Sequence, residues 1–342
     1  MLNKDNIYLI TDEKQRTYLT GFRATDGFVV VKGGEKYLFL DPRYSHAAKK
    51  SVDKKIATVV EGSRKEVFDF IKESGKKELF VDFNKTTLAE ADAYSSLGVT
   101  LKNCSEELAA NMIVKSEAEL GKIKKACKIA EQSLKEIQPL IKEGVTESEL
   151  AAALETRFRI HGATGPSFET IVAFGENAAV PHHETGNTKL KKNECVLIDF
   201  GCVYEGYCSD MTRTFFYGKP DEEFLKAYKA VETAHVTAEK TIYAGITCVE
   251  ADKIARDILT EKGYGKYFTH SLGHGIGVNI HEAPALSPKG KGTLENGMVF
   301  SIEPGVYING KFGIRIENTV TLKDGVVSPM MKTGKKLVVI GD

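Results

Sequence analysis

Two acidic residues stand inside a stretch that otherwise reads as a β-hairpin. Residues 196–216, VLIDFGCVYEGYCSDMTRTFF, predict two strands joined by a polar turn at 204–206. Asp199 and Asp210 are equally far from the junction that follows Tyr204, so a hairpin centred there would place them directly opposite each other. Cross-strand partners have Cβ atoms about 4.5–5.5 Å apart, and two unpaired carboxylates buried that close are costly. The stretch therefore predicts a bound cation.

A second stretch repeats this arrangement further along the chain. Glu303 and Glu317 lie symmetrically about Gly310 on β-rich segments, and the dipeptide Asn309-Gly310 favours a hairpin turn between them. Arg315 precedes the second carboxylate by two residues. A single hairpin of this kind could be a salt-bridged packing feature. Two in one chain indicate a site that binds cations.

Three histidines lie between the two acidic pairs. His270, His274 and His281 fall within twelve positions of a glycine-rich segment, in which the backbone can approach a ligand closely. The run GHGIG has neither the spacing of a dinucleotide loop nor the Lys-Ser/Thr of a phosphate loop, which argues against nucleotide binding. The run HEAPA is not the HExxH of zinc proteases, because its fifth residue is Ala285.

The chemistry of these residues favours a dinuclear metal site. Four carboxylates and one imidazole carry too much negative charge for one ion and suit two divalent ions. Oxygen and imidazole ligands fit manganese, cobalt, iron or zinc, whereas a structural zinc site would use thiolates. Two such ions hold a bridging hydroxide at neutral pH and polarise a carbonyl or phosphoryl group. The predicted reaction class is therefore hydrolysis of an amide or a phosphoester.

Composition bounds the remaining possibilities. The 342 residues, 42% of them hydrophobic, suffice for two domains. Lys and Arg together number 47, as do Asp and Glu, so no net charge draws the chain toward nucleic acid or an anionic membrane. We expect a cytoplasmic protein, because the N-terminus lacks a signal peptide and no apolar run is long enough to span a membrane. The six cysteines, none in a CxxC pair, are expected to be free thiols.

The chain divides in two by pattern. Residues 1–112 alternate short apolar strands with helices, which predicts a small α/β domain without obvious chemistry of its own. An amphipathic helix over Glu117–Ile141 follows, with a capping box at Ser116 and Glu119 and a stop near Gly144. We therefore place the second domain at 113–342, and it contains every candidate site residue.

These motifs resemble those of a known family. IDFG, YCSDMTRT, GHGIGxxxHE, EPGVY and GIRIE occur in the order found in the aminopeptidase P and prolidase group of metallopeptidase family M24, and the resemblance covers nearly the whole chain. It implies an α+β fold: a "pita-bread" catalytic domain, as in creatinase and the aminopeptidases, at 113–342, preceded by a smaller α/β domain of the creatinase type at 1–112.

The resemblance also implies a ligand set for two divalent ions. Asp199 would chelate one ion, Asp210 and Glu317 would bridge both, and His274 and Glu303 would complete the shell of the second. Manganese is the first expectation for the metal, with cobalt, zinc or iron as alternatives.

The implied activity is hydrolysis of the bond between an N-terminal residue and a following proline, by attack of a metal-bridging hydroxide. His182 and His281 would contact the substrate and the tetrahedral intermediate, and His270 matches a further active-site position. Glu303 would move the proton, and Arg315 would orient a ligand carboxylate. The substrate would be an X-Pro dipeptide or a longer X-Pro peptide, and the family implies a homodimer.

Several other protein classes share part of this pattern. Methionine aminopeptidase shares the catalytic fold but usually lacks a domain like 1–112, and creatinase-like hydrolases do not keep all five ligands. A non-catalytic binding protein on this fold typically loses ligands that are all present here. A phosphoesterase of another fold fits the ligand set but not the order of the motifs. The sequence leaves open whether the enzyme is a dipeptidase or an aminopeptidase.

Overall fold

The computed structural model describes residues 2–341, which form two compact units that meet in the sequence between Met112 and Ile113. Each unit has its own buried core. Within the described residues, no helix is both long enough and apolar enough to cross a membrane.

The N-terminal unit is a six-stranded mixed sheet with helices on both faces. Its strand order is β4-β3-β2-β1-β5-β6, and only the pairs β1–β2 and β2–β3 are antiparallel. Successive strand residues point to opposite faces, so Tyr8 and Ile10 join one core cluster while Ile7 and Leu9 join the other. The elements are β1 (Ile7–Ile10), α1 (Glu13–Thr20), β2 (Phe28–Lys32), β3 (Glu35–Leu40), α2 (Pro42–Ser51), β4 (Thr58–Glu61), α3 (Arg64–Glu73), β5 (Glu78–Val81), α4 (Leu88–Ser95), β6 (Thr100–Asn103) and α5 (Ser105–Ile113).

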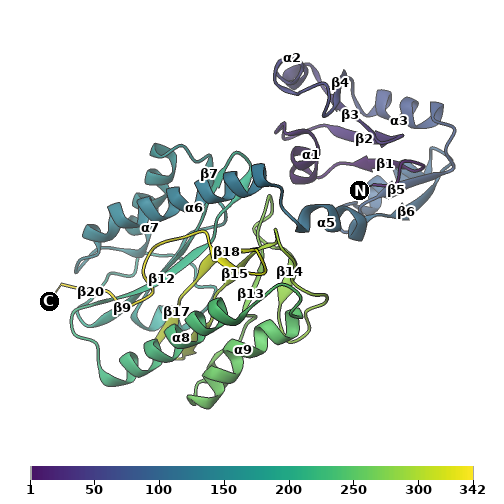
Figure 1. The fold of residues 1–342 in the computed structure, drawn as a ribbon. Helices are drawn as coiled ribbons and strands as arrows, with labels where there is room; N and C mark the ends of the chain where they lie inside the picture. Colours follow the sequence, from purple (N-terminus) through teal and green to yellow (C-terminus); the bar gives the residue numbers. More distant parts are fainter. Residues whose placement is uncertain (1, 342) are drawn as a thin grey trace. The chain divides into compact units, whose positions relative to one another are not determined.

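The C-terminal unit places largely antiparallel sheets between two pairs of helices; only β12 and β20 pair in parallel among the described strands. Figure 1 shows α6 and α7 on one side of the strands and α8 and α9 on the other. The sheets have the orders β20-β12-β9-β8, β14-β13-β15-β18-β19, β11-β10-β7 and β16-β17. The helices are α6 (Glu117–Ile137), α7 (Glu147–Ile160), α8 (Glu222–Thr241) and α9 (Cys248–Glu261). The strands are β7 (Gly165–Pro166), β8 (Ile171–Phe174), β9 (Glu194–Phe200), β10 (Cys202–Tyr204), β11 (Tyr207–Cys208), β12 (Met211–Tyr217), β13 (Gly273–Gly275), β14 (Glu282–Leu286), β15 (Val299–Ile302), β16 (Gly305–Ile308), β17 (Phe312–Arg315), β18 (Asn318–Lys323), β19 (Val326–Pro329) and β20 (Val339–Ile340).

Helix α6 begins as predicted and ends earlier. The Ser116 hydroxyl accepts a hydrogen bond from the Glu119 N–H, and the Glu119 carboxylate accepts one from the Ser116 N–H, as a capping box requires. The prediction of a helix to Ile141 is wrong, because the α-helix stops at Ile137 and a short 3₁₀ turn follows. Pro139 lies in that turn, where its missing N–H cannot continue the α-helical ladder.

The predicted face-to-face placement of Asp199 and Asp210 is wrong. Asp199 pairs with Thr212, and the pairing of Tyr204 with Tyr207 shows that the loop has two residues, not three. Both loop residues have positive φ (46° and 84°), as a type I′ turn requires. The hairpin is therefore centred one residue later than expected, which makes the two aspartates diagonal neighbours rather than direct partners.

The predicted register of the second hairpin is correct. Strands β16 and β17 pair Gly305 with Arg315, and β15 and β18 pair Ile302 with Asn318, in the same register on both sides of a short gap. Glu303 and Glu317 occupy opposed positions in that gap. Their backbone N–H groups donate to other segments instead, at Leu272 O (2.8 Å) and Thr212 O (3.1 Å). The interruption therefore ties these carboxylates to β12 and to the segment that precedes β13.

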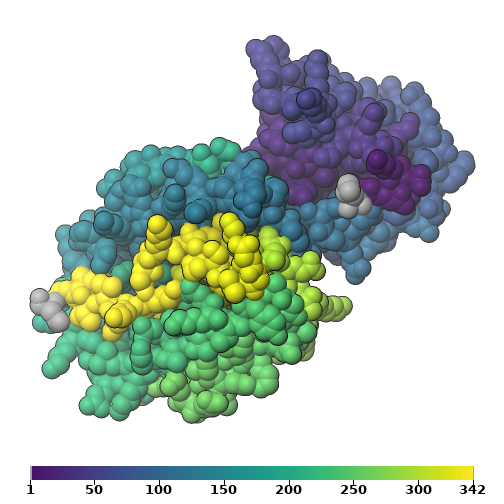
Figure 2. Space-filling view, viewed as in Figure 1, coloured from purple at the N-terminus to yellow at the C-terminus, as the bar shows by residue number. Residues whose placement is uncertain are grey.

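Hydrogen bonds from Arg213 join the C-terminal segment to the backbone that carries the second acidic pair. Arg213, which is 3% exposed, donates hydrogen bonds to the backbone oxygens of Glu317, Thr333 and Gly334. The Glu131 carboxylate of α6 accepts the Thr333 N–H. Figure 2 shows these last residues, in yellow, crossing the surface of the C-terminal unit. The guanidinium thus fixes the backbone of Glu317.

Candidate metal centre

One cavity of about 530 Å³ in the C-terminal unit collects the predicted site residues. They come from strands β9, β13 and β17, from the gaps beside β12, β15 and β18, and from three loops. Residues far apart in the sequence therefore share one wall. The cavity is lined by all nine candidates: His182, Asp199, Asp210, His270, His274, His281, Glu303, Arg315 and Glu317.

A subset of these side chains converges closely enough to hold a metal ion. One ligand atom from each of Asp210, His274 and Glu317 lies within 4.8 Å of the others. The Nε2 atom of His274 lies 3.5 Å from Asp210 Oδ2 and 3.4 Å from Glu303 Oε1. Asp199 reaches the same cavity from β9. Carboxylate oxygens and one imidazole nitrogen form a donor set that suits divalent manganese, iron, cobalt or zinc.

The protonation state of His274 decides whether its ring can coordinate a metal ion. Its Nδ1 lies 3.1 Å from the backbone oxygen of Gly275, so Nδ1 carries the hydrogen and Nε2 presents a lone pair. Burial lowers the pKa of His274, which keeps the ring neutral. That lone pair therefore faces the carboxyl groups of Asp210 and Glu303. A cation at this point would be coordinated by the imidazole nitrogen and by the oxygens around it.

Two buried carboxylate oxygens also lack partners. Within the described residues, Asp199 Oδ1 and Glu317 Oε1 are inaccessible to solvent and make no hydrogen bond. Buried polar atoms are normally paired, and an unpaired buried charge is costly. Both orphaned oxygens belong to residues that line the same cavity. The residues present therefore fit a bound metal.

Burial and mutual repulsion raise the pKa values of three acidic residues in the cavity. Burial, followed by the charges of Glu317 and Asp199, raises the pKa of Asp210 well above its usual range. Burial likewise raises the pKa of Glu303 to about 8, and burial with the charge of Glu303 raises the pKa of Glu317 far above normal. Three carboxyl groups thus resist ionisation together unless positive charge joins them.

A chain of hydrogen bonds links one acidic residue to a distant histidine. Arg315 Nη2 donates to Asp199 Oδ2 (2.5 Å), and Arg315 Nη1 donates to the Tyr307 hydroxyl (2.7 Å). The Tyr307 hydroxyl in turn lies 2.8 Å from His270 Nε2. Burial lowers the pKa of His270 to about 3, and its Nδ1 faces the Ser271 oxygen, so Nε2 accepts from the tyrosine. This series of hydrogen bonds orients Asp199 at one end and His270 at the other.

Three further side chains that position the site residues were not singled out from the sequence. Thr212 Oγ1 donates to Glu317 Oε2 (2.7 Å), and Ser301 Oγ donates to Glu303 Oε1 (3.0 Å). Tyr307 completes the set. All three lie in the motifs that carry the family resemblance or beside them, so motif membership was the available signal. Hydroxyl residues in strands are too common for the pattern alone to indicate this role.

Three more histidines line the cavity, and they differ in their contacts. His182 and His281 line the cavity, and the His281 ring lies edge-on to His274 with centroids 4.2 Å apart. His183, beside His182, instead has its Nε2 3.0 Å from Glu147 Oε2 at the start of α7. Glu147 is fully buried and also accepts the backbone N–H groups of Phe174 and Gly186. His183 therefore anchors the loop that presents His182.

Helix α9 clamps the segment that carries His270. Asp252, 1% exposed, pairs through both oxygens with Arg256 (2.7 and 2.9 Å) and accepts the Leu272 N–H (2.9 Å). Arg256 donates to the backbone oxygens of Phe268 (3.1 Å) and His270 (2.8 Å). Two side chains one helical turn apart thus hold the backbone on both sides of His270.

Replacing Asp252 with alanine is expected to lower the free energy of unfolding by about 2–4 kcal/mol, because Arg256 and the Leu272 N–H lose a buried partner. The matched control is Asp257→Ala, which breaks the exposed Lys253–Asp257 pair of the same helix and should cost less than about 1 kcal/mol. Urea unfolding of both variants measures the difference. Equal losses would contradict the clamp.

Comparisons with known proteins identify the family of the chain. The model of metallopeptidase family M24 matches residues 121–324. The chain belongs to this family. The model of the creatinase/prolidase N-terminal domain matches residues 3–111, ahead of the catalytic region. The resemblance inferred from the motifs is thereby confirmed, as is the α+β fold with its smaller N-terminal domain.

One relative and two solved structures match nearly the whole length of this chain. The uncharacterized peptidase YqhT of Bacillus subtilis is 33% identical over 336 residues, 97% of this chain and 95% of that protein. The structure of an Xaa-Pro dipeptidase from Bacillus anthracis superimposes with a TM-score of 0.94 at 34% identity, covering 98% of this chain and 95% of the other. An X-Pro aminopeptidase from Thermotoga maritima gives 0.91 at 34%, with coverages of 98% and 97%. The chain is a metallopeptidase of the M24 type.

Proposed function

We propose that this M24 peptidase removes an N-terminal residue that is followed by proline, using two divalent metal ions. The observation that carries the proposal is the convergence on one cavity of four carboxylates and the bare Nε2 of His274, with two buried oxygens left unpaired. The similarity to proteins described as an Xaa-Pro dipeptidase and an X-Pro aminopeptidase supports the choice of proline.

The metal would be held by side chains that the structure already orients. The proposed ligands are Asp199, Asp210, His274, Glu303 and Glu317, with manganese as the first candidate for both ions. When bound, divalent ions supply a water molecule that is deprotonated near neutral pH and polarise the scissile carbonyl. Arg315 holds Asp199 at one oxygen and Thr212 holds Glu317, which leaves the unpaired oxygen of each free to coordinate.

The other residues act on the substrate and its protons. His182 and His281 would donate to the oxygen on which charge develops during attack. Glu303, whose Oε1 is held by Ser301, would take the proton of the attacking water and deliver it to the leaving nitrogen. That nitrogen needs a proton because it would otherwise have to leave as an amide anion.

A pair of peptides tests this function. Manganese-loaded enzyme should release free alanine from Ala-Pro-Ala at a kcat/KM at least about a hundredfold above that for Ala-Ala-Ala, since differences in substrate fit of about 2.7 kcal/mol give that ratio. Chromatography of the products measures both rates and shows which bond is cut. Equal rates on the two peptides would exclude a proline-directed enzyme, and activity on phosphoesters but on neither peptide would indicate the other reaction class.

A further inference from the structure

The charge balance of the cavity bears on which X-Pro substrates it accepts. Among the described residues that line it, Arg315 is the single lysine or arginine. The lining includes six carboxylates: Glu169, Glu184, Asp199, Asp210, Glu303 and Glu317. A substrate that brings a carboxylate into this cavity therefore enters a strongly acidic surrounding.

Arg315 is not available to receive a substrate carboxylate. Its side chain is 4% exposed, and its three nitrogens donate to Asp199, to the Tyr307 hydroxyl and to Thr212 Oγ1 (3.0 Å). Turning toward a ligand would break the pair with Asp199 and leave that carboxylate buried and uncompensated, which is costly. The cavity thus has no free permanent cation among its described residues.

The histidines of the wall do not fill this gap. His183 is bound to Glu147, and His270 is neutral with its Nε2 accepting from Tyr307. His274 is turned toward Asp210 and Glu303. The other two histidines of the wall, His182 and His281, contact the substrate carbonyl in the proposed mechanism.

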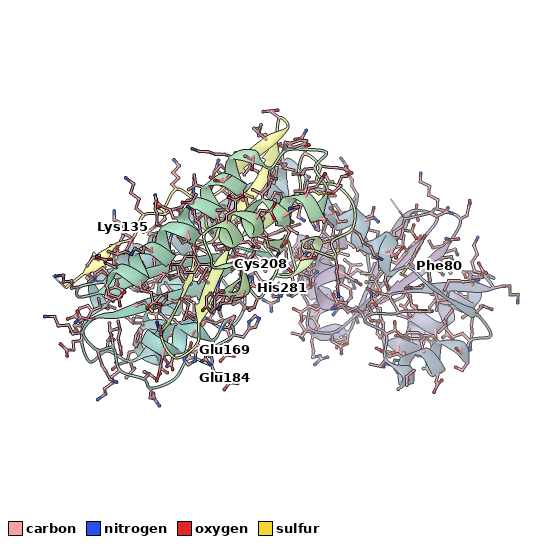
Figure 3. All side chains as sticks on the ribbon, turned by 90° about the horizontal axis from the view of Figure 1, so that it is seen from below. Phe80, Lys135, Glu169, Glu184, Cys208 and His281 are labelled. Atoms are coloured by element: carbon pink, nitrogen blue, oxygen red, sulfur yellow. The ribbon has the colours of Figure 1, made fainter. Side chains whose placement is uncertain are left out.

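Two of the six carboxylates differ from the others in being exposed and unpartnered. Glu169 and Glu184 lie on the cavity wall, and neither side chain has a hydrogen-bond or ion-pair partner within residues 2–341. The Thr185 hydroxyl donates to the Thr170 oxygen (2.8 Å), which joins the segments that carry them. Figure 3 shows Glu169 and Glu184 on the same side of the C-terminal unit. Neither belongs to the proposed ligand set, so metal ions bound by the inner four would not pair with them.

We infer that this site selects X-Pro peptides that continue beyond the proline and discriminates against free X-Pro dipeptides, with Glu169 and Glu184 as specificity-determining residues. The inference rests on the proposed function. In a dipeptide the proline bears a free carboxylate, which would enter a cavity where no lysine or arginine of the lining is free to pair with it and where Glu169 and Glu184 are exposed. In a longer peptide the same position is a neutral amide, while the N-terminal ammonium is attracted by the wall in both cases.

A substrate pair that differs only in that carboxylate tests the inference. Ala-Pro and Ala-Pro-amide present the same scissile bond, and the metal-loaded full chain is expected to have a kcat/KM at least about tenfold higher for the amide, equivalent to about 1.4 kcal/mol. The difference should lie mainly in KM and shrink as salt is raised, because exposed charges are screened. A preference for Ala-Pro over its amide would overturn the inference.

Charge-neutral variants locate the origin of the preference. In the double variant Glu169→Gln with Glu184→Gln, the amide-to-acid ratio of kcat/KM should fall severalfold. The matched control is Glu176→Gln, an exposed glutamate of the same region that does not line the cavity and should keep the wild-type ratio. An unchanged ratio in the double variant would overturn the assignment to these two residues.

The outcomes separate this inference from the proposed function. Cleavage of Ala-Pro at or above the rate of the amide would leave an X-Pro peptidase in place and refute only the substrate class. Failure to cleave either compound, while Ala-Ala-Ala is cut, would refute the proposed function itself. Binding of uncleaved Ala-Pro to the metal-loaded protein, measured by calorimetry, gives a readout independent of turnover and should be weaker than that of the amide.

Discussion

Replacing Asp210 with asparagine is expected to lower kcat/KM on X-Pro peptides by at least about a thousandfold and to reduce the bound metal to less than two ions per chain. The side chain keeps its volume but loses the charge that the proposed bridging position needs. Metal ions contribute several kcal/mol to stabilising charge in the transition state, and about 1.4 kcal/mol corresponds to a tenfold rate change. Steady-state kinetics and elemental analysis of the same sample measure both effects.

Stability should respond to this substitution with opposite signs in the two metal states. In metal-free protein at alkaline pH, Asp210→Asn removes a buried charge beside Glu317 and should raise the Tm by about 2–4 °C for each kcal/mol of repulsion relieved. In manganese-loaded protein it removes a ligand and should lower the Tm. The control is Asp257→Asn, an exposed aspartate of α9 that should change neither state. Normal metal content and activity in Asp210→Asn would contradict the ligand assignment.

Metal-free protein is expected to lose stability as the pH rises through the neutral range, whereas metal-loaded protein is not. Burial raises the pKa of Glu303 from 4.5 to about 8 in the folded metal-free state, so the folded chain holds a proton that the unfolded chain releases near pH 4.5. The resulting stability is fully present below pH 4.5 and is lost as the pH rises through about 8. At 1.36 kcal/mol for each pKa unit, the loss from Glu303 is about 5 kcal/mol at most.

Thermal unfolding in the presence of a chelator or of manganese, at pH values from 5 to 9, measures this gap. The raised pKa values of Asp210 and Glu317 act in the same direction and extend the loss upward in pH. Bound metal holds the carboxylates ionised, so the difference in Tm between the two states should widen with pH. Glu303→Gln should flatten the curve of the chelated protein. A gap that is constant across this range would contradict a crowded carboxylate centre.

Local patterns in the sequence carried much of the fold. The capping box at Ser116 begins a helix where predicted, because a capping box depends only on residues three positions apart. The second hairpin also formed in the predicted register, since Asn309 and Gly310 lie in a short turn that sets the pairing of its neighbours. The first hairpin failed by one residue at its centre. A polar run such as Tyr204–Gly206 admits two- and three-residue loops, and only the φ values of the folded chain decide between them.

The candidate site residues could be predicted from motifs, but the hydrogen bonds that connect them could not be predicted. Nothing in the pattern indicates that Arg315 reaches back to Asp199 or that Tyr307 joins it to His270, since these contacts link three separate segments. The sequence does not predict the α9 clamp at Asp252 and Arg256 either, because these residues look like an ordinary charged pair one helical turn apart. Its partner is a backbone segment that only tertiary packing brings near.

The sequence alone determined which groups are candidates for the chemistry: acidic residues set in β-rich segments, and histidines in a glycine-rich run, are costly to bury, so their pattern predicts a ligand. The tertiary structure decided how those groups are arranged. It made Asp199 and Asp210 diagonal rather than opposed, left one oxygen of Asp199 and one of Glu317 unpaired, committed Arg315 to the inner wall and set Glu169 and Glu184 free on the same cavity. Charge is a property of each residue, whereas pairing depends on which distant segments meet.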